Sequence, residues 1–241
     1  AQEGDLPLER LPRTDEELDQ FDLIIIGDVP AGFFTDQQLE LFSESVASEG
    51  TGLLWIGGGR STPSTWKGTP LEDLLPFSPP FDLGEITGGV VVEPTKTATD
   101  LGLFVVDPVS IDGWIPELSL RSTGWSLLRS VQRIDDRKLK PTTEILARVV
   151  DQDEIGHPGV VMMRFGAGQI IYSTFDDIWR WRFGRGEDLT DRWWVGILRL
   201  MARQSIDSGG RIGELSLDSQ AASPGTPTTI RLSVFDELVS D

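Results

Sequence analysis

Cysteine is absent from this chain of 241 residues, and histidine occurs once, at His157. The lack of cysteine excludes disulfides, thiolate nucleophiles and thiolate metal sites. No hydrophobic run approaches the roughly 20 residues that cross a bilayer, so the sequence predicts no direct membrane insertion. Basic residues are also scarce, 21 against 39 acidic ones, and the formal net charge is −18. Such a charge repels phosphate groups, which argues against nucleic acid and anionic lipid as partners.

The remaining composition is ordinary for a globular protein, with 39% hydrophobic and 25% charged residues. The chain starts at Ala1 without a leader segment, so we expect a piece of a longer protein. We predict one α/β domain over residues 1–207. Residues 208–241 are predicted to be a linker and the truncated start of a β-sandwich, because 213–218 and 228–235 alternate like half-buried antiparallel strands.

A glycine-rich turn organises the first half of the chain. Residues 53–56 predict a buried strand, which Gly57, Gly58 and Gly59 terminate abruptly, followed by Arg60 and Ser61. In open α/β sheets, ligands and catalytic groups gather beyond the carboxyl ends of such strands. The sequence therefore predicts that this turn borders any functional site.

The segment before this turn predicts a β-α-β unit. Residues 21–28 contain the continuous apolar run 23–26 and end at Asp28, which is typical of a fully buried strand. Residues 35–38 form a capping box that opens a helix, and Gly50 is a suitable left-handed stop.

The sequence pattern predicts secondary structure less clearly in the rest of the chain, above all between residues 81 and 141. Residues 69–72 predict a second capping box and a short helix, and the neighbourhoods of Trp114 and Trp125 predict loops pinned by aromatic side chains. A final helix is predicted from about Leu189. Further strands are predicted at 90–92, 103–106, 143–150, 160–165 and 169–174, the last two joined as a hairpin by 166–168.

Four segments carry a resemblance to a known family. They are 21–28, 50–61, 69–76 and the run from Phe165 to Arg182, which contains Trp-Arg-Trp-Arg at 179–182. In this order they resemble the glutamine-amidotransferase-like domain of large bacterial cell-envelope proteins that also carry a von Willebrand factor A domain. The resemblance implies a class I amidotransferase-like, flavodoxin-like fold, a mostly parallel sheet flanked by helices, here with a short C-terminal β segment. It also implies a soluble fragment of a membrane-anchored protein, in an extracytoplasmic location.

The resemblance also defines what an active member would need. Active amidotransferases place a cysteine at the turn after the strand matching 53–57, with a histidine and a glutamate late in the chain. This sequence has Gly58, Gly59 and Arg60 at the turn, and no Cys-His-Glu set can be assembled. We therefore expect no glutamine hydrolysis, and no cofactor is indicated.

The turn itself allows two interpretations. Its backbone amides can form an oxyanion or anion cradle to which Arg60 adds charge, or its glycines can simply provide a tight turn with positive φ. Ser61 and Ser64 are possible nucleophiles only if a base lies within reach. The single histidine, His157, precedes a strand and is expected in an exposed loop, which argues against a Ser-His-Asp arrangement.

Three carboxylates follow predicted strand ends: Asp28, Asp176 and Asp177. Together they can hold a hard cation or act as acid and base. The alternative is structural, with these side chains capping helices or pairing with Arg60, Arg180 or Arg182. The sequence has no calcium-loop spacing, which favours the structural alternative.

The run Trp179, Arg180, Trp181 and Arg182 also allows two interpretations. It can present a stacking platform for a sugar or peptide. Alternatively, alternate side chains point opposite ways, so that the tryptophans fill the core while the arginines bind carboxylates and carbonyls. Eight tryptophans in the chain favour the architectural interpretation.

These observations lead to three functional hypotheses. The first is a non-catalytic interaction or scaffold module of a larger envelope protein, whose partners are proteins or other domains of the same chain. The second is a hydrolase or amidotransferase-related enzyme that uses carboxylates or Ser61 at the turn. The third is a carbohydrate-binding module built on exposed tryptophans. Oligomeric state stays open.

Overall fold

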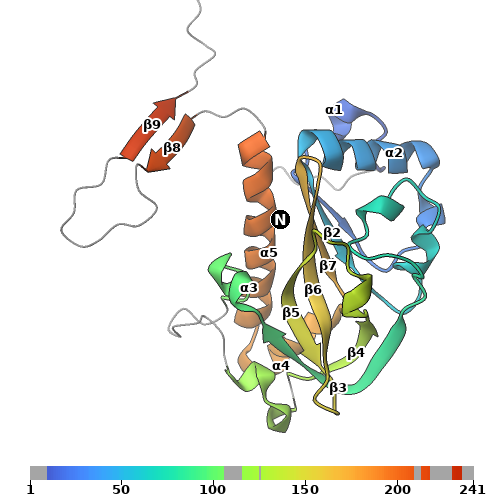
Figure 1. Cartoon of the computed structure of the whole chain (residues 1–241), viewed down its shortest axis with the longest axis vertical. Coiled ribbons are helices and arrows are strands. Elements are labelled where there is room, and N and C mark those ends of the chain that lie inside the picture. Colours follow the sequence, from blue (N-terminus) through green and yellow to red (C-terminus); the bar gives the residue numbers. More distant parts are fainter. Residues whose placement is uncertain (1–9, 106–115, 125, 209–212, 218–229, 235–241) are drawn as a thin grey trace, which may run out of the picture.

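The fold is built on one mixed sheet of seven strands. The computed structural model describes residues 10–105, 116–124, 126–208, 213–217 and 230–234. The strand order across the sheet is β1-β2-β7-β6-β5-β3-β4 (Figure 1). The strands are β1 (Leu23–Ile26), β2 (Gly52–Ile56), β3 (Gly84–Pro94), β4 (Leu128–Arg133), β5 (Glu144–Val150), β6 (Gly156–Phe165) and β7 (Gly168–Ser173).

The expectation of a mostly parallel, flavodoxin-like sheet is wrong. Only the pairs β1–β2 and β2–β7 are parallel, and the other four neighbouring pairs are antiparallel. Parallel neighbours need a long crossover, whereas antiparallel ones can follow a tight turn. Residues 151–155 and the turn at Gly166 (φ 58°) provide such tight turns around β6. These short connections account for the antiparallel pairs β5–β6 and β6–β7, whereas β3 pairs antiparallel with β4 and β5 across longer stretches of chain.

The α-helices in the described part of the chain are α1 (Asp15–Leu18), α2 (Asp36–Glu44), α3 (Lys96–Asp100), α4 (Arg182–Arg185) and α5 (Asp188–Ser208). The capping box predicted at α2 is confirmed, because Thr35 and Gln38 satisfy each other's backbone N–H groups. A π-helical turn extends α2 to Glu49, and Gly50 stops it at φ 82°, as predicted.

Two hydrophobic cores lie on opposite faces of the sheet. Strand β2 alternates between them, so that Leu53 and Trp55 enter the core beside α2, while Leu54 enters the core beside α5. Figure 1 shows α2 and α5 on the two sides of the sheet. Such burial on both faces explains why the central strand reads as a continuous apolar run.

Several local expectations are corrected. Strand β1 is an edge strand rather than a fully buried one, and Ile25 is 48% exposed. Residues 69–72 form no second capping box; a 3-10 helix, Glu72–Leu74, lacks a side-chain cap. Instead of the strand predicted at 103–106, residues 101–104 form a turn, in which Phe104 is buried at φ 62°. Trp114 and Trp125 lie outside the described residues.

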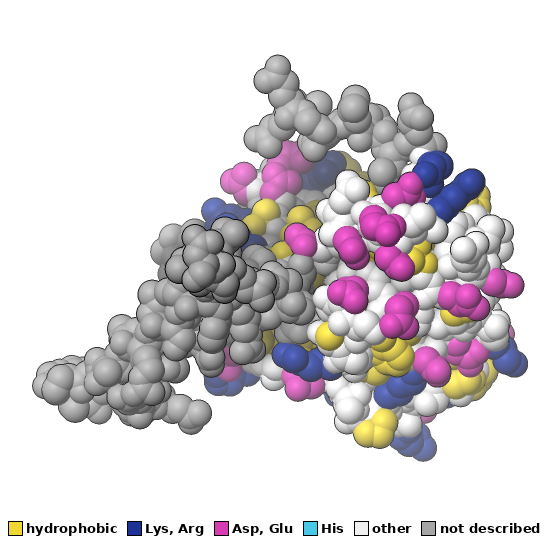
Figure 2. Space-filling model, turned by 90° about the horizontal axis from the view of Figure 1, so that it is seen from above, with side chains coloured by type: hydrophobic (Ala, Val, Ile, Leu, Met, Phe, Trp, Pro, Cys, Tyr) yellow, Lys and Arg dark blue, Asp and Glu magenta, His cyan; other side chains and the backbone are white. Residues whose placement is uncertain are grey.

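The C-terminal elements match their prediction more closely. Helix α5 buries Trp193, Ile197 and Met201 against the sheet. Strands β8 (Gly213–Leu217) and β9 (Ile230–Val234) pair antiparallel as a separate two-stranded sheet. Within the described ranges, no helix has both the length and the apolar character that a membrane crossing requires. The face shown in Figure 2 carries many more acidic than basic side chains.

Candidate functional site

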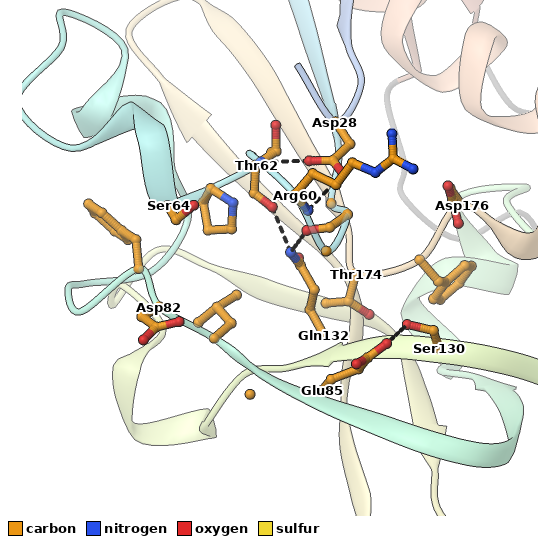
Figure 3. A pocket seen from close by; sticks show the side chains of 18 residues that line it. Asp28, Arg60, Thr62, Ser64, Asp82, Glu85, Ser130, Gln132, Thr174 and Asp176 are labelled. Atoms are coloured by element: carbon orange, nitrogen blue, oxygen red, sulfur yellow. Dashed lines mark hydrogen bonds between the residues drawn. The ribbon is translucent and has the colours of Figure 1, made fainter. Parts of the chain in front are cut away.

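A cavity of about 690 Å³ lies where the chain leaves β1, β2 and β7. Asp28, Gly57 and Thr174 follow the ends of these three strands and line it. Residues 81–85 and the strand β4 form its other wall (Figure 3). The cavity thus lies beyond the ends of the parallel strands, where the sequence places the candidate pocket, although its opposite wall comes from the antiparallel half of the sheet.

The carboxylate of Asp28 binds the backbone of the glycine turn. Oδ2 accepts the N–H of Arg60 at 2.9 Å, and Oδ1 accepts those of Ser61 at 2.7 Å and Thr62 at 2.8 Å. Successive N–H groups in a turn form a concavity that binds an anion. The predicted anion cradle thus exists, but the anion that it holds is a side chain of the same protein.

At Gly57 and Gly58, glycine is needed because neighbouring side chains pack closely against the backbone, and not because φ is positive. A Cβ at Gly58 would overlap the carboxyl group of Asp28, and a Cβ at Gly57 would overlap the amide of Gln132. A Cβ at Gly59 would meet no atom within 4 Å. The prediction that these glycines provide positive φ is wrong, because they are not among the positive-φ glycines.

A buried hydrogen-bond network supports the turn from below. Gln132 on β4 donates its Nε2 to the carbonyl oxygens of Gly58 at 2.7 Å and Thr62 at 2.6 Å. Its Oε1 accepts the hydroxyl of Tyr172 on β7 at 2.6 Å. The Thr62 hydroxyl donates to the carbonyl of Gly27 at 2.8 Å. Burial, and then the charge of Asp28, raise the pKa of Tyr172, so this phenol stays neutral and acts as a donor.

The candidate nucleophiles have no base beside them in the observed contacts. Ser61 does not line the cavity, and the Ser64 hydroxyl, which does, donates to the Ser61 carbonyl at 3.2 Å. His157 lies in β6 rather than in an exposed loop, and its Nε2 is 3.2 Å from the Asp151 carboxylate. The imidazole of His157, the single histidine of the sequence, is therefore paired with Asp151 in the β5–β6 connection.

The three predicted carboxylates separate into two environments. Asp28 and Asp176 line the cavity, whereas Asp177 does not, and it accepts the backbone N–H of Arg129 at 2.9 Å. Burial chiefly, and then the charge of Asp177, raise the pKa of Asp176; Asp28 adds to the effect. Burial, more than neighbouring charge, therefore accounts for the raised pKa of Asp176.

Two further carboxylates were missed by the sequence analysis. Asp82 and Glu85 line the cavity from the β3 side, and Glu85 accepts the hydroxyl of Ser130 on β4 (Figure 3). Gln132 was missed as well. The strand pattern of β3 is interrupted by a bulge between Thr87 and Val90, so its first residues carry no clear alternation. We find no signal in the sequence that places Gln132 under the turn.

The tryptophan-arginine run is a 3-10 helix, Asp177–Trp181, rather than an extended segment. Trp181 is fully buried and donates Nε1 to the Ser126 carbonyl at 3.2 Å, as the architectural interpretation requires. Trp179 is 46% exposed, with the ring of Phe183 at 5.8 Å and the Arg180 guanidinium 5.6 Å from its centroid. Neither Trp179 nor Arg180 lines the cavity; the Nε of Arg180 donates to the Leu127 carbonyl at 2.9 Å.

Chemically, the cavity presents carboxylates, hydroxyl groups, one guanidinium and apolar side chains. Within the part of the chain that the structure describes, no group of three or more His, Asp or Glu side chains is placed to hold a metal ion. The site therefore offers recognition by charge, hydrogen bonds and apolar contact.

No protein-family model matches the chain, and no curated protein matches it either. Solved structures with a similar fold include Cytoplasmic Protein STM1381 from Salmonella typhimurium LT2, with a TM-score of 0.57 and 23% identity, covering 80% of this chain and 76% of that one. Cytoplasmic Protein STM3548 from Salmonella typhimurium gives a TM-score of 0.56 and 20% identity, covering 79% and 76%. Likeness at this level of identity describes the fold alone.

Proposed function

We propose that this chain is a non-catalytic binding module whose ligand site is the cavity above the glycine turn. One observation carries the proposal: the Asp28 carboxylate accepts the backbone N–H groups of Arg60, Ser61 and Thr62. Acyl-transfer enzymes stabilise a developing oxyanion with free N–H donors at such a position. In this chain an internal carboxylate already occupies those donors.

The turn also leaves no room for a nucleophile at its second glycine. Any side chain at position 58 would collide with Asp28, and the chain has no cysteine to place there. An open cavity nevertheless remains above the turn, within the range of about 300–1,000 Å³ that is typical of ligand sites. Binding without turnover accounts for both features.

The setting of this module is part of the proposal. The resemblance of segments 21–28 and 50–61 to the glutamine-amidotransferase-like domain of envelope proteins supports an extracytoplasmic interaction module in a membrane-anchored protein. Its partners would be proteins or other domains of the same chain. Protease accessibility of the longer parent protein in intact cells tests this location.

The function is tested by screening for binding and turnover together. We would titrate ¹⁵N-labelled protein with small ligands of mixed charge and check each ligand for chemical conversion. We expect shifts of amide signals around the cavity, such as those of Gly59 and Ser130, and no conversion of ester, amide, glycoside or phosphate substrates. Glu40→Gln, on the exposed side of α2, serves as a control and should change neither result.

A second candidate, a hydrolase, is favoured by the raised pKa of Asp176, because such a carboxyl group donates a proton closer to neutral pH. If the chain is this enzyme, one substrate of the panel is converted, and the rate falls as the pH rises through the pKa of Asp176. Asp176→Asn would then abolish conversion while Glu40→Gln retains it. That result would overturn the non-catalytic proposal.

A further inference from the structure

We infer that the cavity binds a small organic cation, an ammonium or guanidinium group carried on an aliphatic stem. The inference rests on the proposed function, because it names the ligand class of the same cavity. The charges, hydrogen-bond donors and apolar surfaces of the cavity walls determine which class of ligand can bind there.

The charged side chains of the walls favour a cation. Four carboxylates line the cavity, those of Asp28, Asp82, Glu85 and Asp176, against the single guanidinium of Arg60. They come from both walls, so they surround the space rather than cover one surface (Figure 3). A concave surface lined by charges of one sign focuses the field and concentrates ions of opposite sign.

The distribution of backbone donors disfavours an anion. The N–H groups of Arg60, Ser61 and Thr62 bind Asp28, and those of Gly57 and Gly58 bind the carbonyl oxygens of Ser173 and Thr62. A phosphate or carboxylate ligand could bind the N–H groups of Arg60, Ser61 and Thr62 only by displacing Asp28 from them. The carboxylates of Asp82, Glu85 and Asp176 on the cavity walls can instead accept an N–H donor of a ligand.

The apolar residues of the walls fit an aliphatic stem. Pro63, Phe81, Leu83 and Phe175 line the same cavity as the carboxylates. Apolar surface beside acceptors for a cationic head matches a chain of methylene groups that ends in an ammonium group. Two sources share this chemistry, a free polyamine and the lysine side chain of a peptide.

The inference is tested by titrating the labelled protein with putrescine, spermidine and N-acetyl-lysine methylamide. Butanediol and succinate serve as neutral and anionic comparisons of similar length. We expect the amide signals of the cavity to respond to the cations more strongly than to either comparison. A stronger response to spermidine than to the lysine derivative identifies a free polyamine as the source, and the reverse identifies a peptide.

Variants separate binding in the cavity from general attraction to an acidic protein. The double variant Asp82→Asn/Glu85→Gln should weaken cation binding about tenfold or more, since each carboxylate acts at close range in a partly shielded site. Glu40→Gln removes an acidic charge outside the cavity and should change the affinity less than about twofold at about 0.15 M salt. Equal weakening by both variants would overturn the inference.

The titration results distinguish a wrong ligand class from a wrong proposed function. If butanediol or succinate binds in the cavity and the cations do not, the ligand class is wrong while the binding function stands. If a cation binds and is chemically converted, the non-catalytic function is wrong while the ligand class stands. If no compound of any charge perturbs the cavity, both are overturned.

Discussion

At the scale of single residues, Asp28 holds the glycine turn in place, because its two carboxylate oxygens accept three backbone N–H groups. We expect Asp28→Asn, which keeps the size but loses the charge, to lower the free energy of unfolding by about 1–3 kcal/mol. Hydrogen bonds to a charged acceptor contribute about 1.5–3 kcal/mol each, but those sharing one acceptor do not add fully. Urea unfolding measures the change. A free energy of unfolding equal to that of the native chain would contradict this role.

Two neighbouring glycines provide a matched comparison. Gly58→Ala should lower the free energy of unfolding by about 1–3 kcal/mol, because its Cβ would overlap the Asp28 carboxyl group and force the turn to move. Gly59→Ala should change it by less than about 0.5 kcal/mol, since its Cβ would point into open space. Thermal and urea unfolding of both variants test the difference. Equal effects would mean that close approach to Asp28 does not select glycine at position 58.

At the scale of elements, Gln132 joins the antiparallel half of the sheet to the turn after β2. Gln132→Leu should cost about 2–4 kcal/mol, because it leaves the buried Tyr172 hydroxyl and two carbonyl oxygens without this partner. Tyr172→Phe alone should cost about 1 kcal/mol. A double-mutant cycle by urea unfolding measures the coupling, and the double variant should cost less than the sum of the two. Strict additivity would contradict a shared network.

Elements with strong local signals could be predicted from the sequence. The capping box at Thr35, the left-handed Gly50 and the hairpin at Gly166 each depend on a few adjacent residues, and each is present. The paired strands β8 and β9 were also predicted, from alternation alone.

Features that depend on distant partners could not be predicted in this way. The position of β1 at the sheet edge is set by its neighbours, not by its own apolar residues, and its expected full burial is therefore wrong. Asp28 and the glycine turn were predicted to lie at one site. The wall formed by Glu85 and Gln132 was not, because it depends on antiparallel pairing between β3 and β4, which joins these two residues 47 positions apart in the sequence.

At the scale of the whole molecule, the net charge of −18 opposes the compact state through repulsion between acidic side chains. Raising the salt concentration from about 0.01 M to about 0.15 M shortens the Debye length from about 30 Å to about 8 Å. We therefore expect the melting temperature to rise by about 2–4 °C, which corresponds to about 1 kcal/mol for a chain of this size. Sodium and potassium chloride should act alike if screening is the cause.

A single charge reversal separates this repulsion from other effects of salt. Glu40 lies on α2 one helical turn from both Asp36 and Glu44, where like charges repel. Glu40→Lys replaces both repulsions by attractions, so at about 0.01 M salt it should raise the free energy of unfolding by about 0.5–1 kcal/mol. At about 1 M salt, where the Debye length is about 3 Å, most of the gain should disappear. A gain that persists at high salt would point to helix propensity rather than charge. Urea unfolding of Glu40→Gln, which removes the repulsion without adding attraction, should fall between the native chain and Glu40→Lys.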